Sequence, residues 1–323
     1  MASNPYMIMM VGISGSGKST LARHIAIDND EVFIRDDINN SGNPVIHSSD
    51  DLREELYGDA NNQEHNDELF IELHRRIKSD LRAGKNVIYD ATNINKKLRV
   101  SFLNELKNIQ CCKVCIAVMT PLEDCLKNNA NRERKVPERA IRKMYKNWQP
   151  PHYHEGFDMI HFSFLLRDGE EMKQYRIADL YETMNSFDQE NEHHSLSLGG
   201  HCSKALNYIA KNYGDNDVLL AAAALHDIGK LETKVRINRR GIDDGNCHYY
   251  QHQCVGAYMA VFYLAGKKSA EDIVDIINII YFHMHPYMSW KQSEKAKEKD
   301  KRLIGDKLFN DIMALHEADI SAH

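Results

Sequence analysis

The stretch GISGSGKST, from Gly12 to Thr20, decides the fold of the first half of the chain. It follows the apolar run Met7–Val11 and precedes a helical pattern, so the order is strand, glycine-rich turn, helix. This order matches the phosphate-binding loop GxxxxGK[ST], in which glycines let backbone N–H groups surround phosphate oxygens. The pattern predicts ATP contacts from Gly12, Ser14, Gly15, Ser16, Gly17, Lys18, Ser19 and Thr20.

Two side chains of this loop have specific expected roles. Lys18 is expected to reach the outer phosphates of ATP, and Ser19 is expected to hold Mg²⁺. The following helix directs the positive end of its dipole at the anion. The simpler interpretation is a chance glycine-rich turn, and the flanking strand and helix argue against it.

Further apolar strand candidates alternate with amphipathic helical segments up to about Arg167. The strands are expected at 44–47, 86–89, 113–118 and 159–164, and the helices at 65–83, 96–109, 121–131 and 137–147. Such alternation is typical of an α/β domain with a parallel sheet flanked by helices. After Arg167 the strand signals stop, and the sequence predicts an all-α second domain.

Length and composition agree with two globular domains. A chain of 323 residues exceeds the size at which one core usually keeps growing, and 42% hydrophobic residues suffice for packed cores. We expect domains at 1–168 and 191–323, joined by a linker at 169–190.

Three further observations narrow the class of protein. There is no run of roughly 18 apolar residues and no secretion signal, so we expect no membrane association. The seven cysteines are odd in number and three of them crowd residues 111–115, which favours a reducing cytoplasm. The net charge of −6 argues against broad nucleic-acid binding driven by total charge.

An acidic residue and an arginine follow the second expected strand, at Asp50 and Arg53. Catalytic residues of open α/β folds gather at this edge of the sheet. Asp50 can take the proton of an acceptor hydroxyl, and Arg53 can bind a phosphate of the acceptor. The simpler interpretation is a helix cap and an exposed arginine, and Asp51 could supply the cap while Asp50 does the chemistry.

Two more charged features accompany the phosphate-binding loop. Asp90 ends the third expected strand, where a carboxylate would order Mg²⁺ or hold the loop. The basic segment Lys127–Lys146 is expected to form a lid over the transferring phosphates. We single out Arg132 and Arg134 from this segment, because most of its other charges are typical of a solvated helix face.

Together these motifs resemble the kinase domain of the bacteriophage-type polynucleotide 5′-kinases. The family pattern continues with Asp-x-Thr-Asn, here Asp90–Asn93, and with an arginine lid before Val136-Pro137. The resemblance implies that Asp50 is the general base, that Arg53 grips the phosphate following the acceptor nucleotide, and that Arg132 stabilises charge on the migrating phosphoryl group. Two departures, Asn128 in place of a lid arginine and the insert Ile34–Gly42, leave the acceptor size open.

The second domain carries an adjacent pair, His226-Asp227, at the end of the apolar segment Val218–Leu225. Further candidates for metal ligands are His201, His252, His283 and Asp319. Imidazole and carboxylate ligands from separate helices, with Asp227 able to bridge, suit one or two divalent ions that activate water against a phosphoester. Any single histidine among the 17 is more simply a surface or core residue, and His161, His285 and His316 receive no role.

The order of these residues resembles the HD phosphohydrolase superfamily. The resemblance implies a first metal bound by His201, His226, Asp227 and Asp319, and a second site completed by His252 and His283. It also implies a substrate-phosphate contact from Lys230, and divalent transition metals such as Mn²⁺. His194 is a further candidate.

Combined, the two resemblances predict an ATP-dependent kinase of RNA or DNA 5′-hydroxyl ends coupled to a 2′,3′-phosphatase or cyclic phosphodiesterase. Such an enzyme heals broken RNA ends, and a separate ligase would seal them, because this sequence shows no ligase lysine motif. The alternative is a small-molecule or nucleoside kinase fused to an HD nucleotidase. A third interpretation, an ATP-sensing switch, does not require an acceptor base such as Asp50.

Overall fold

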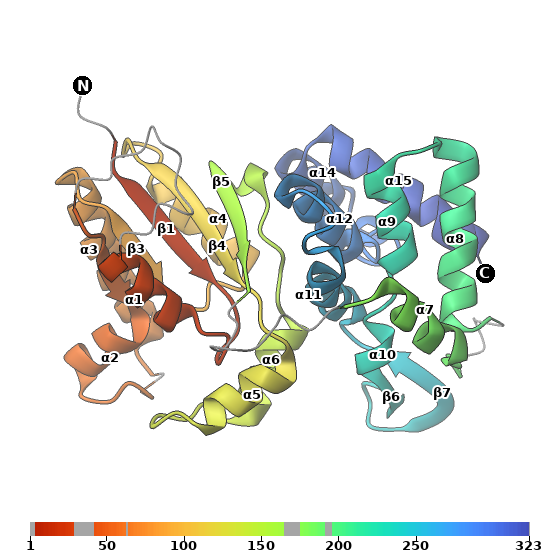
Figure 1. The fold of residues 1–323 in the computed structure, drawn as a ribbon, viewed down its shortest axis with the longest axis horizontal. Coiled ribbons are helices and arrows are strands. Elements are labelled where there is room, and N and C mark those ends of the chain that lie inside the picture. The colour runs from red at the N-terminus through yellow and green to blue at the C-terminus, as the bar shows by residue number, and fades with distance from the viewer. Residues whose placement is uncertain (1–3, 29–41, 63, 165–174, 191–195, 323) are drawn as a thin grey trace. The chain divides into compact units, whose positions relative to one another are not determined.

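The computed structural model describes residues 4–28, 42–62, 64–164, 175–190 and 196–322 (Figure 1). The chain divides into two compact units, residues 1–144 with 155–169, and residues 145–154 with 170–323. His194 and residues 34–41 of the expected insert lie outside the described residues.

The first unit is built on a five-stranded parallel sheet in the order β2-β3-β1-β4-β5. Its strands are β1 Tyr6–Val11, β2 Val45–Ser48, β3 Val87–Asp90, β4 Cys112–Val118 and β5 Met159–Ser163. Its helices are α1 Lys18–Asp28, α2 Ser49–Tyr57, α3 Asn66–Arg82, α4 Lys96–Glu105, α5 Leu122–Ala130 and α6 Glu138–Lys146, the last ending in the second unit. The predicted α/β class with a parallel sheet is confirmed.

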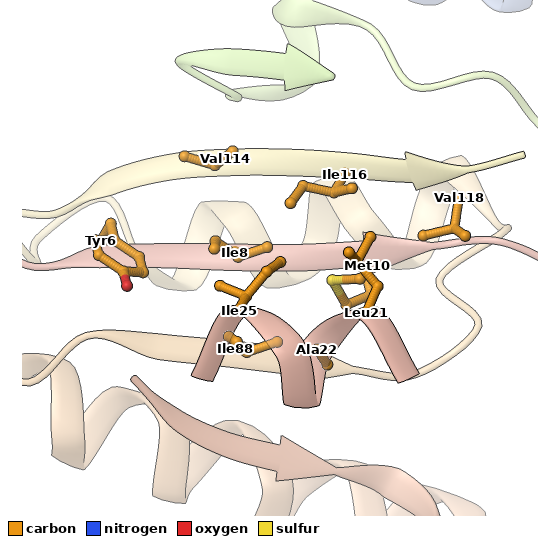
Figure 2. Close-up of a cluster of buried hydrophobic side chains, with 10 residues drawn as sticks. All are labelled: Tyr6, Ile8, Met10, Leu21, Ala22, Ile25, Ile88, Val114, Ile116 and Val118. Atoms are coloured by element: carbon orange, nitrogen blue, oxygen red, sulfur yellow. The ribbon is translucent and has the colours of Figure 1, made fainter. Parts of the chain in front are cut away.

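Helices cover both faces of this sheet, so the central strand β1 is buried along its whole length. Figure 2 shows one face, where Leu21 and Ile25 of α1 lie over alternate residues of β1 and β4 and over Ile88 of β3. On the other face the ring of Tyr89 from β3 contacts His74 of α3 and Phe102 of α4. Alternating side chains of the strands therefore supply two apolar layers.

The parallel arrangement brings the ends of three strands to one edge. β1 runs into the phosphate-binding loop, β2 runs into α2, and β3 ends at Asp90. Ser48 at the end of β2 pairs with Asp90 in the sheet register. After β3 the chain crosses β1 to form β4, and this reversal of strand order is where open α/β sheets bind ligands.

The second unit is mostly helical, as predicted. Its helices are α7 Ile177–Ser186, α8 Leu198–Tyr213, α9 Asp217–Leu225, α10 Lys230–Thr233, α11 His252–Leu264, α12 Ala270–Phe282, α13 Ser289–Gln292, α14 Glu294–Ile304 and α15 Asp306–Ser321; a 3₁₀ turn, η2, spans Tyr153–Glu155. α8 packs against α9 and α15, while α12 packs against α9 and α11.

One feature of this unit differs from the expectation of an all-α domain. An antiparallel hairpin, β6 Lys234–Ile237 and β7 Asp243–Tyr249, is inserted between α10 and α11. Its strands are largely exposed. β6, Lys234–Ile237, alternates polar and apolar residues over only four positions and β7 does not alternate, so the strand signal in the sequence is weak.

Residues 145–154 pack with the second unit, although the sequence-based limits assign them to the first domain. Trp148 is fully buried and its ring contacts Tyr258 of α11. Asn278 of α12 donates a hydrogen bond to the Pro151 carbonyl at 3.0 Å. The segment therefore covers helices of the second unit.

Among the described residues, no helix has both the length and the apolar character that crossing a bilayer requires. The seven cysteines form no disulfide bond.

Candidate functional site

The phosphate-binding loop is shaped by its glycines and by contacts from α5. Gly15 and Gly17 have φ values of 87° and 92°, a region that favours glycine. A Cβ atom on Gly15 would lie 2.2 Å from the carbonyl oxygen of Cys125. Asn128, which stands where a lid arginine was expected, donates to the Gly15 carbonyl at 3.0 Å. The other predicted ATP contacts, Gly12, Ser14, Ser16 and Thr20, lie in the same turn or in the first turn of α1.

The structure brings Lys18, Ser19 and Asp90 together. The Lys18 ammonium is buried and donates to the Ile13 carbonyl at 2.8 Å. Burial, opposed mainly by the charge of Asp90, lowers the pKa of Lys18 to about 8. Burial raises the pKa of Asp90, while a hydrogen bond from Ser19 acts in the opposite direction. A buried cation, a hydroxyl and a carboxylate thus meet beside the loop.

The segment after Asp90 fastens the end of β3 to the end of β1. The Gly12 amide donates to the Thr92 carbonyl at 2.9 Å, and Asn93 donates to the Met10 carbonyl at 2.9 Å. Asn93 has a φ of 46°, in the left-handed region. The Asp-x-Thr-Asn pattern therefore fixes the backbone from which the phosphate-binding loop departs.

Asp50 lies in the first turn of α2, where its carboxylate is held by two arginines. Arg53 donates to one oxygen at 3.0 Å, and Arg134 forms an ion pair with the other at 2.7 Å. The side chain of Asp50 is 54% exposed, whereas that of Arg53 is 5% exposed. A carboxylate open to solvent is thus oriented by a buried guanidinium.

The simpler interpretation of this stretch does not describe the structure. Arg53 is buried and also donates to Asn66 at 3.1 Å. The expectation that Asp51 caps α2 is wrong, because the Ser48 hydroxyl accepts from the Asp51 amide at 3.2 Å and is the cap. Asp50 is therefore free of any capping role.

The two lid arginines lie in different surroundings. Arg134 donates to the Ala60 carbonyl at 2.5 Å and to Asn61 at 2.9 Å, besides pairing with Asp50. Arg132 is half-buried, and its charge helps to lower the pKa of Lys18. The structure therefore places Arg134 with the expected acceptor residues, whereas Arg132 lies near the lysine of the phosphate-binding loop.

In the second unit, six predicted ligands converge although they come from five parts of the fold. They are His201 in α8, His226 and Asp227 after α9, His252 at the start of α11, His283 after α12 and Asp319 in α15. All six are buried, with at most 7% exposure. They form two groups around Asp227, and in each group three of the potential ligand atoms lie within 4.8 Å of one another.

The first group surrounds the Nε2 atom of His201. This atom lies 3.2 Å from Nε2 of His226 and 3.0 Å from Oδ1 of Asp319. Oδ2 of Asp227 lies 3.5 Å from both histidine nitrogens. Two imidazoles and two carboxylates thus face one point.

The second group uses the other oxygen of the same aspartate. Oδ1 of Asp227 lies 3.2 Å from Nε2 of His252 and 3.6 Å from Nε2 of His283. The two histidine nitrogens are 3.2 Å apart. Asp227 therefore presents one oxygen to each group.

Backbone carbonyls orient three of these imidazoles. The Nδ1 atoms of His226, His252 and His283 face the carbonyls of Ala223, Tyr249 and Ile280 at 2.9, 2.8 and 2.6 Å. A proton on Nδ1 leaves the Nε2 lone pair directed into the group. Lone pairs 3.2 Å apart repel unless a cation lies between them, so the donor set fits divalent metal ions.

Lys230 and Gly229 complete the surroundings of Asp227. Burial disfavours ionisation of Asp227, but the ammonium of Lys230 at 2.7 Å, with His226, holds its pKa well below the usual range. A Cβ atom on Gly229 would lie 2.0 Å from the His252 carbonyl oxygen. The backbones that carry the two groups therefore touch at this glycine.

Family comparisons match the two halves of the chain. Residues 7–151 match the family described as AAA domain, and residues 193–311 match the family described as HD domain. The first range holds the phosphate-binding loop, and the second holds every member of the histidine and aspartate cluster except Asp319. The chain joins a P-loop kinase domain to an HD domain.

Several known proteins are similar to parts of the chain. The L-seryl-tRNA(Sec) kinase of Methanococcus maripaludis is 28% identical over 160 residues, which are 47% of this chain and 56% of that protein, so the chain spans little more than half of this relative. The solved Pnkp1/Rnl/Hen1 RNA repair complex contains a chain with 23% identity and a TM-score of 0.35, over 46% of this chain and 45% of the other. A gluconokinase from Sinorhizobium meliloti 1021 has 14% identity and a TM-score of 0.34, over 50% and 84%.

The HD domain contains two polar residues that the sequence did not single out. Tyr287 donates from its hydroxyl to Asp319 at 3.0 Å. Gln189 is fully buried and accepts from Lys230 at 2.8 Å. Neither residue belongs to a motif. Only the folded structure shows that Tyr287 contacts the candidate metal ligand Asp319 and that Gln189 contacts Lys230.

Proposed function

We propose that the kinase domain transfers the γ-phosphate of ATP to the 5′-hydroxyl of a polynucleotide. The HD domain then removes a 2′,3′-cyclic or terminal phosphate, so that broken RNA ends are healed for a separate ligase. The observation that carries this proposal is the open carboxylate of Asp50, held between Arg53 and Arg134. A switch that only senses ATP needs no such group.

In the proposed transfer, Asp50 accepts the proton of the 5′-hydroxyl as the hydroxyl oxygen attacks the γ-phosphorus, the bond from that phosphorus to the β–γ bridging oxygen breaks, and ADP leaves. Lys18 and Arg132 stabilise the charge on the migrating phosphoryl group. Ser19, oriented by Asp90, would hold Mg²⁺, which neutralises charge on the phosphates when bound.

Arg53 is proposed to bind the phosphate that follows the acceptor nucleotide. Its Nε is buried and has no hydrogen-bond partner among the described residues, so a phosphate oxygen that reached it on substrate binding would satisfy this donor. Burial of a guanidinium is costly unless its donors are used. An acceptor with a phosphate next to its terminal nucleoside satisfies this donor, whereas a bare nucleoside does not. This supports a polynucleotide acceptor.

In the proposed hydrolysis, the six histidine and aspartate ligands would hold one or two divalent ions such as Mn²⁺, which activate water when bound. Asp227 fixes the distance between the two groups, and Lys230 contacts the phosphoryl oxygens of the substrate. The same residues suit opening of a cyclic phosphate and removal of a monoester, because both reactions require water to attack phosphorus.

An RNA substrate is favoured over a free metabolite by a second consideration. The similar kinase from Methanococcus maripaludis is, by its name, a kinase of L-seryl-tRNA(Sec), so an acceptor attached to RNA is known in a protein similar to this domain. The alternative, a small-molecule or nucleoside kinase fused to an HD nucleotidase, is favoured by the net charge of −6.

The test is incubation of the purified chain with ATP, Mg²⁺, Mn²⁺ and a short RNA bearing a 5′-hydroxyl and a 2′,3′-cyclic phosphate. We expect gain of a 5′-phosphate and loss of the cyclic phosphate, after which an added RNA ligase seals the ends. The matched DNA oligonucleotide measures preference. If neither end changes while a simple phosphoester is hydrolysed, the metabolite alternative replaces this proposal.

A further inference from the structure

The β6–β7 hairpin is attached at both ends to the metal-ligand cluster of the HD domain. β6 follows α10, which begins at Lys230. β7 ends at Tyr249, whose carbonyl faces Nδ1 of His252 at 2.8 Å. The Lys230 ammonium lies 5.5 Å from the centre of the Tyr249 ring. The hairpin therefore extends directly from the residues that surround the proposed hydrolytic site.

The turn of this hairpin is held by the side chain of Asn238. The Asn238 side chain accepts from the amides of Arg240 and Ile242 at 2.9 and 3.1 Å, and donates to Asp244 at 3.0 Å. Gly241 supplies the left-handed residue, with a φ of 79°. Val235 pairs with His248 and Ile237 with Asp243, so residues 244–247 form a bulge, and the paired length of the hairpin is that of the four residues of β6, about 10 Å.

The cations of the hairpin fall into two classes. Lys234 and Arg236 near its base both pair with Glu190. Arg239 and Arg240 at the turn are exposed and form no ion pair with the described residues. Two exposed guanidiniums that form no ion pair with the described residues therefore lie at the turn of the hairpin.

A stack of planar groups accompanies these arginines. The Arg239 guanidinium lies 4.9 Å from the centre of the Tyr250 ring. His248 is stacked on Tyr250 with centroids 5.5 Å apart and planes 5° apart. Tyr250 is only two residues before the ligand His252. Aromatic rings beside guanidiniums are the groups on which nucleic-acid bases stack.

We infer that this hairpin binds the single-stranded RNA that leads to the 3′ end in the HD site. Arg239 and Arg240 contact phosphates, and the stack around Tyr250 supports a base. The inference deepens the proposed function and rests on it. Two guanidiniums and a ring stack together suit several phosphates and a base, which a polynucleotide offers and a mononucleotide does not.

The hairpin also exposes Val235, Ile237 and Ile242, which would suit a protein partner. Apolar side chains exposed singly are common on protein surfaces, whereas two guanidiniums beside a stacked ring match the phosphates and bases of a single strand. Single-stranded RNA is therefore the ligand that fits this surface, and the test below distinguishes it from a protein partner.

The test measures binding of a short single-stranded RNA with a 5′-fluorescein and a 3′-hydroxyl, which neither domain can turn over. The full chain is titrated by fluorescence anisotropy at several salt concentrations. The double variant R239A/R240A is expected to bind roughly 10-fold more weakly, and its salt slope to fall by about 0.7 for each phosphate that no longer meets an arginine. R302A, which removes an exposed arginine from α14, is the matched control and is expected to bind like the parent chain.

Substitutions of Tyr250 test the same surface without changing its charge. Y250F keeps the ring and is expected to bind normally, whereas Y250L is expected to weaken binding roughly 10-fold. Unchanged affinity in R239A/R240A would overturn the inference, as would equal weakening by R302A. If the double variant bound RNA normally but no longer bound a protein partner, the surface would be assigned to protein docking instead.

The proposed reactions are tested separately from binding, by measuring the 5′ and 3′ ends of the RNA after incubation. Hairpin-dependent RNA binding without end healing would overturn the proposed reactions and support the hairpin. End healing with hairpin-independent binding would overturn only the hairpin.

Discussion

The candidate sites of the kinase and HD domains differ in the charge of the side chains that they bring together. The proposed kinase site gathers cations, namely Lys18, Arg53, Arg132 and Arg134, and the carboxylate of Asp50, the proposed base, is half-open to solvent. The HD site gathers carboxylates and imidazoles, all nearly fully buried. On the proposed function, the cations of the first site contact phosphate oxygens directly, whereas the second site binds the phosphate through metal cations together with Lys230.

In the absence of ligands, each site contains a different electrostatically unfavourable arrangement. In the kinase domain this arrangement is mainly the ammonium of Lys18, which is buried without a bound anion beside it and whose pKa burial lowers. In the HD domain it consists of histidine lone pairs that face one another at 3.2 Å. Substitutions should therefore have separable consequences in the two domains.

The largest effect is expected from D227A, which removes the carboxylate shared by both ligand groups. Hydrolysis of a simple phosphoester should fall to background, and bound metal measured by mass spectrometry should fall as well. Transfer to a 5′-hydroxyl should continue, because Asp227 belongs to the HD domain alone. Equal loss of both activities would contradict the separation of the two sites.

The converse variant is D50A in the kinase domain. Loss of a general base should slow 5′-phosphorylation by about 10²- to 10⁴-fold, while ATP binding measured by calorimetry is retained. D51A is the matched control, because Asp51 is the exposed neighbour whose side chain caps nothing. If D50A phosphorylated RNA at the rate of D51A, the assignment of the base would be wrong.

A smaller effect, on stability, is expected from K18M. The pKa of Lys18 is about 8 in the folded chain and 10.5 ordinarily, so between these pH values the unfolded chain holds a proton that the folded chain has released. Stability from this residue therefore rises with pH through that window, and the full cost is present below pH 8. Without ATP, K18M should raise the free energy of unfolding at pH 7 by up to about 3 kcal/mol.

The measurement is urea unfolding at several pH values. K97M, at an exposed lysine of α4, should leave both the stability and its pH dependence unchanged. A K18M chain that is less stable than K97M at pH 7 would show that hydrogen bonding of Lys18 outweighs its burial.

The smallest effect is expected from Y287F, which removes one hydrogen bond to Asp319. Loss of such an outer contact should weaken metal affinity by about 10-fold, with hydrolysis recovering at saturating metal. Y213F removes a similar bond, at 2.8 Å to Glu317, on an exposed surface and is the control. An equal shift in the metal titration of both variants would exclude a specific role for Tyr287.

Sequence alone predicted the parts of this chain that depend on local pattern. The parallel strands appear within one residue or so of their expected ends, because buried apolar runs bounded by turns leave few alternatives. Lys18, Ser19 and Asp90 meet because a phosphate-binding loop and the end of a neighbouring parallel strand share one edge. The six HD ligands also converge, although their roles remain predictions.

Other parts depend on contacts that no local pattern encodes. Arg134 has a long side chain whose direction is set by Asp50 and Asn61. Its position in the sequence of the lid therefore did not indicate that its guanidinium lies beside Asp50. Gln189 reaches Lys230 across the fold. The turn of the β6–β7 hairpin is held by the side chain of Asn238, and only the four residues of β6 alternate polar and apolar side chains, a signal too weak to overturn the expectation of a helical domain.

Gly229 has a consequence for how this domain can vary. A Cβ atom at this position would lie 2.0 Å from the His252 carbonyl oxygen and 2.5 Å from the Gly256 amide, so any larger residue would push α11, and with it His252, away from Asp227. Gly229 is therefore a place where a single methyl group would change the distance between a histidine and the aspartate that both ligand groups share, without removing any ligand.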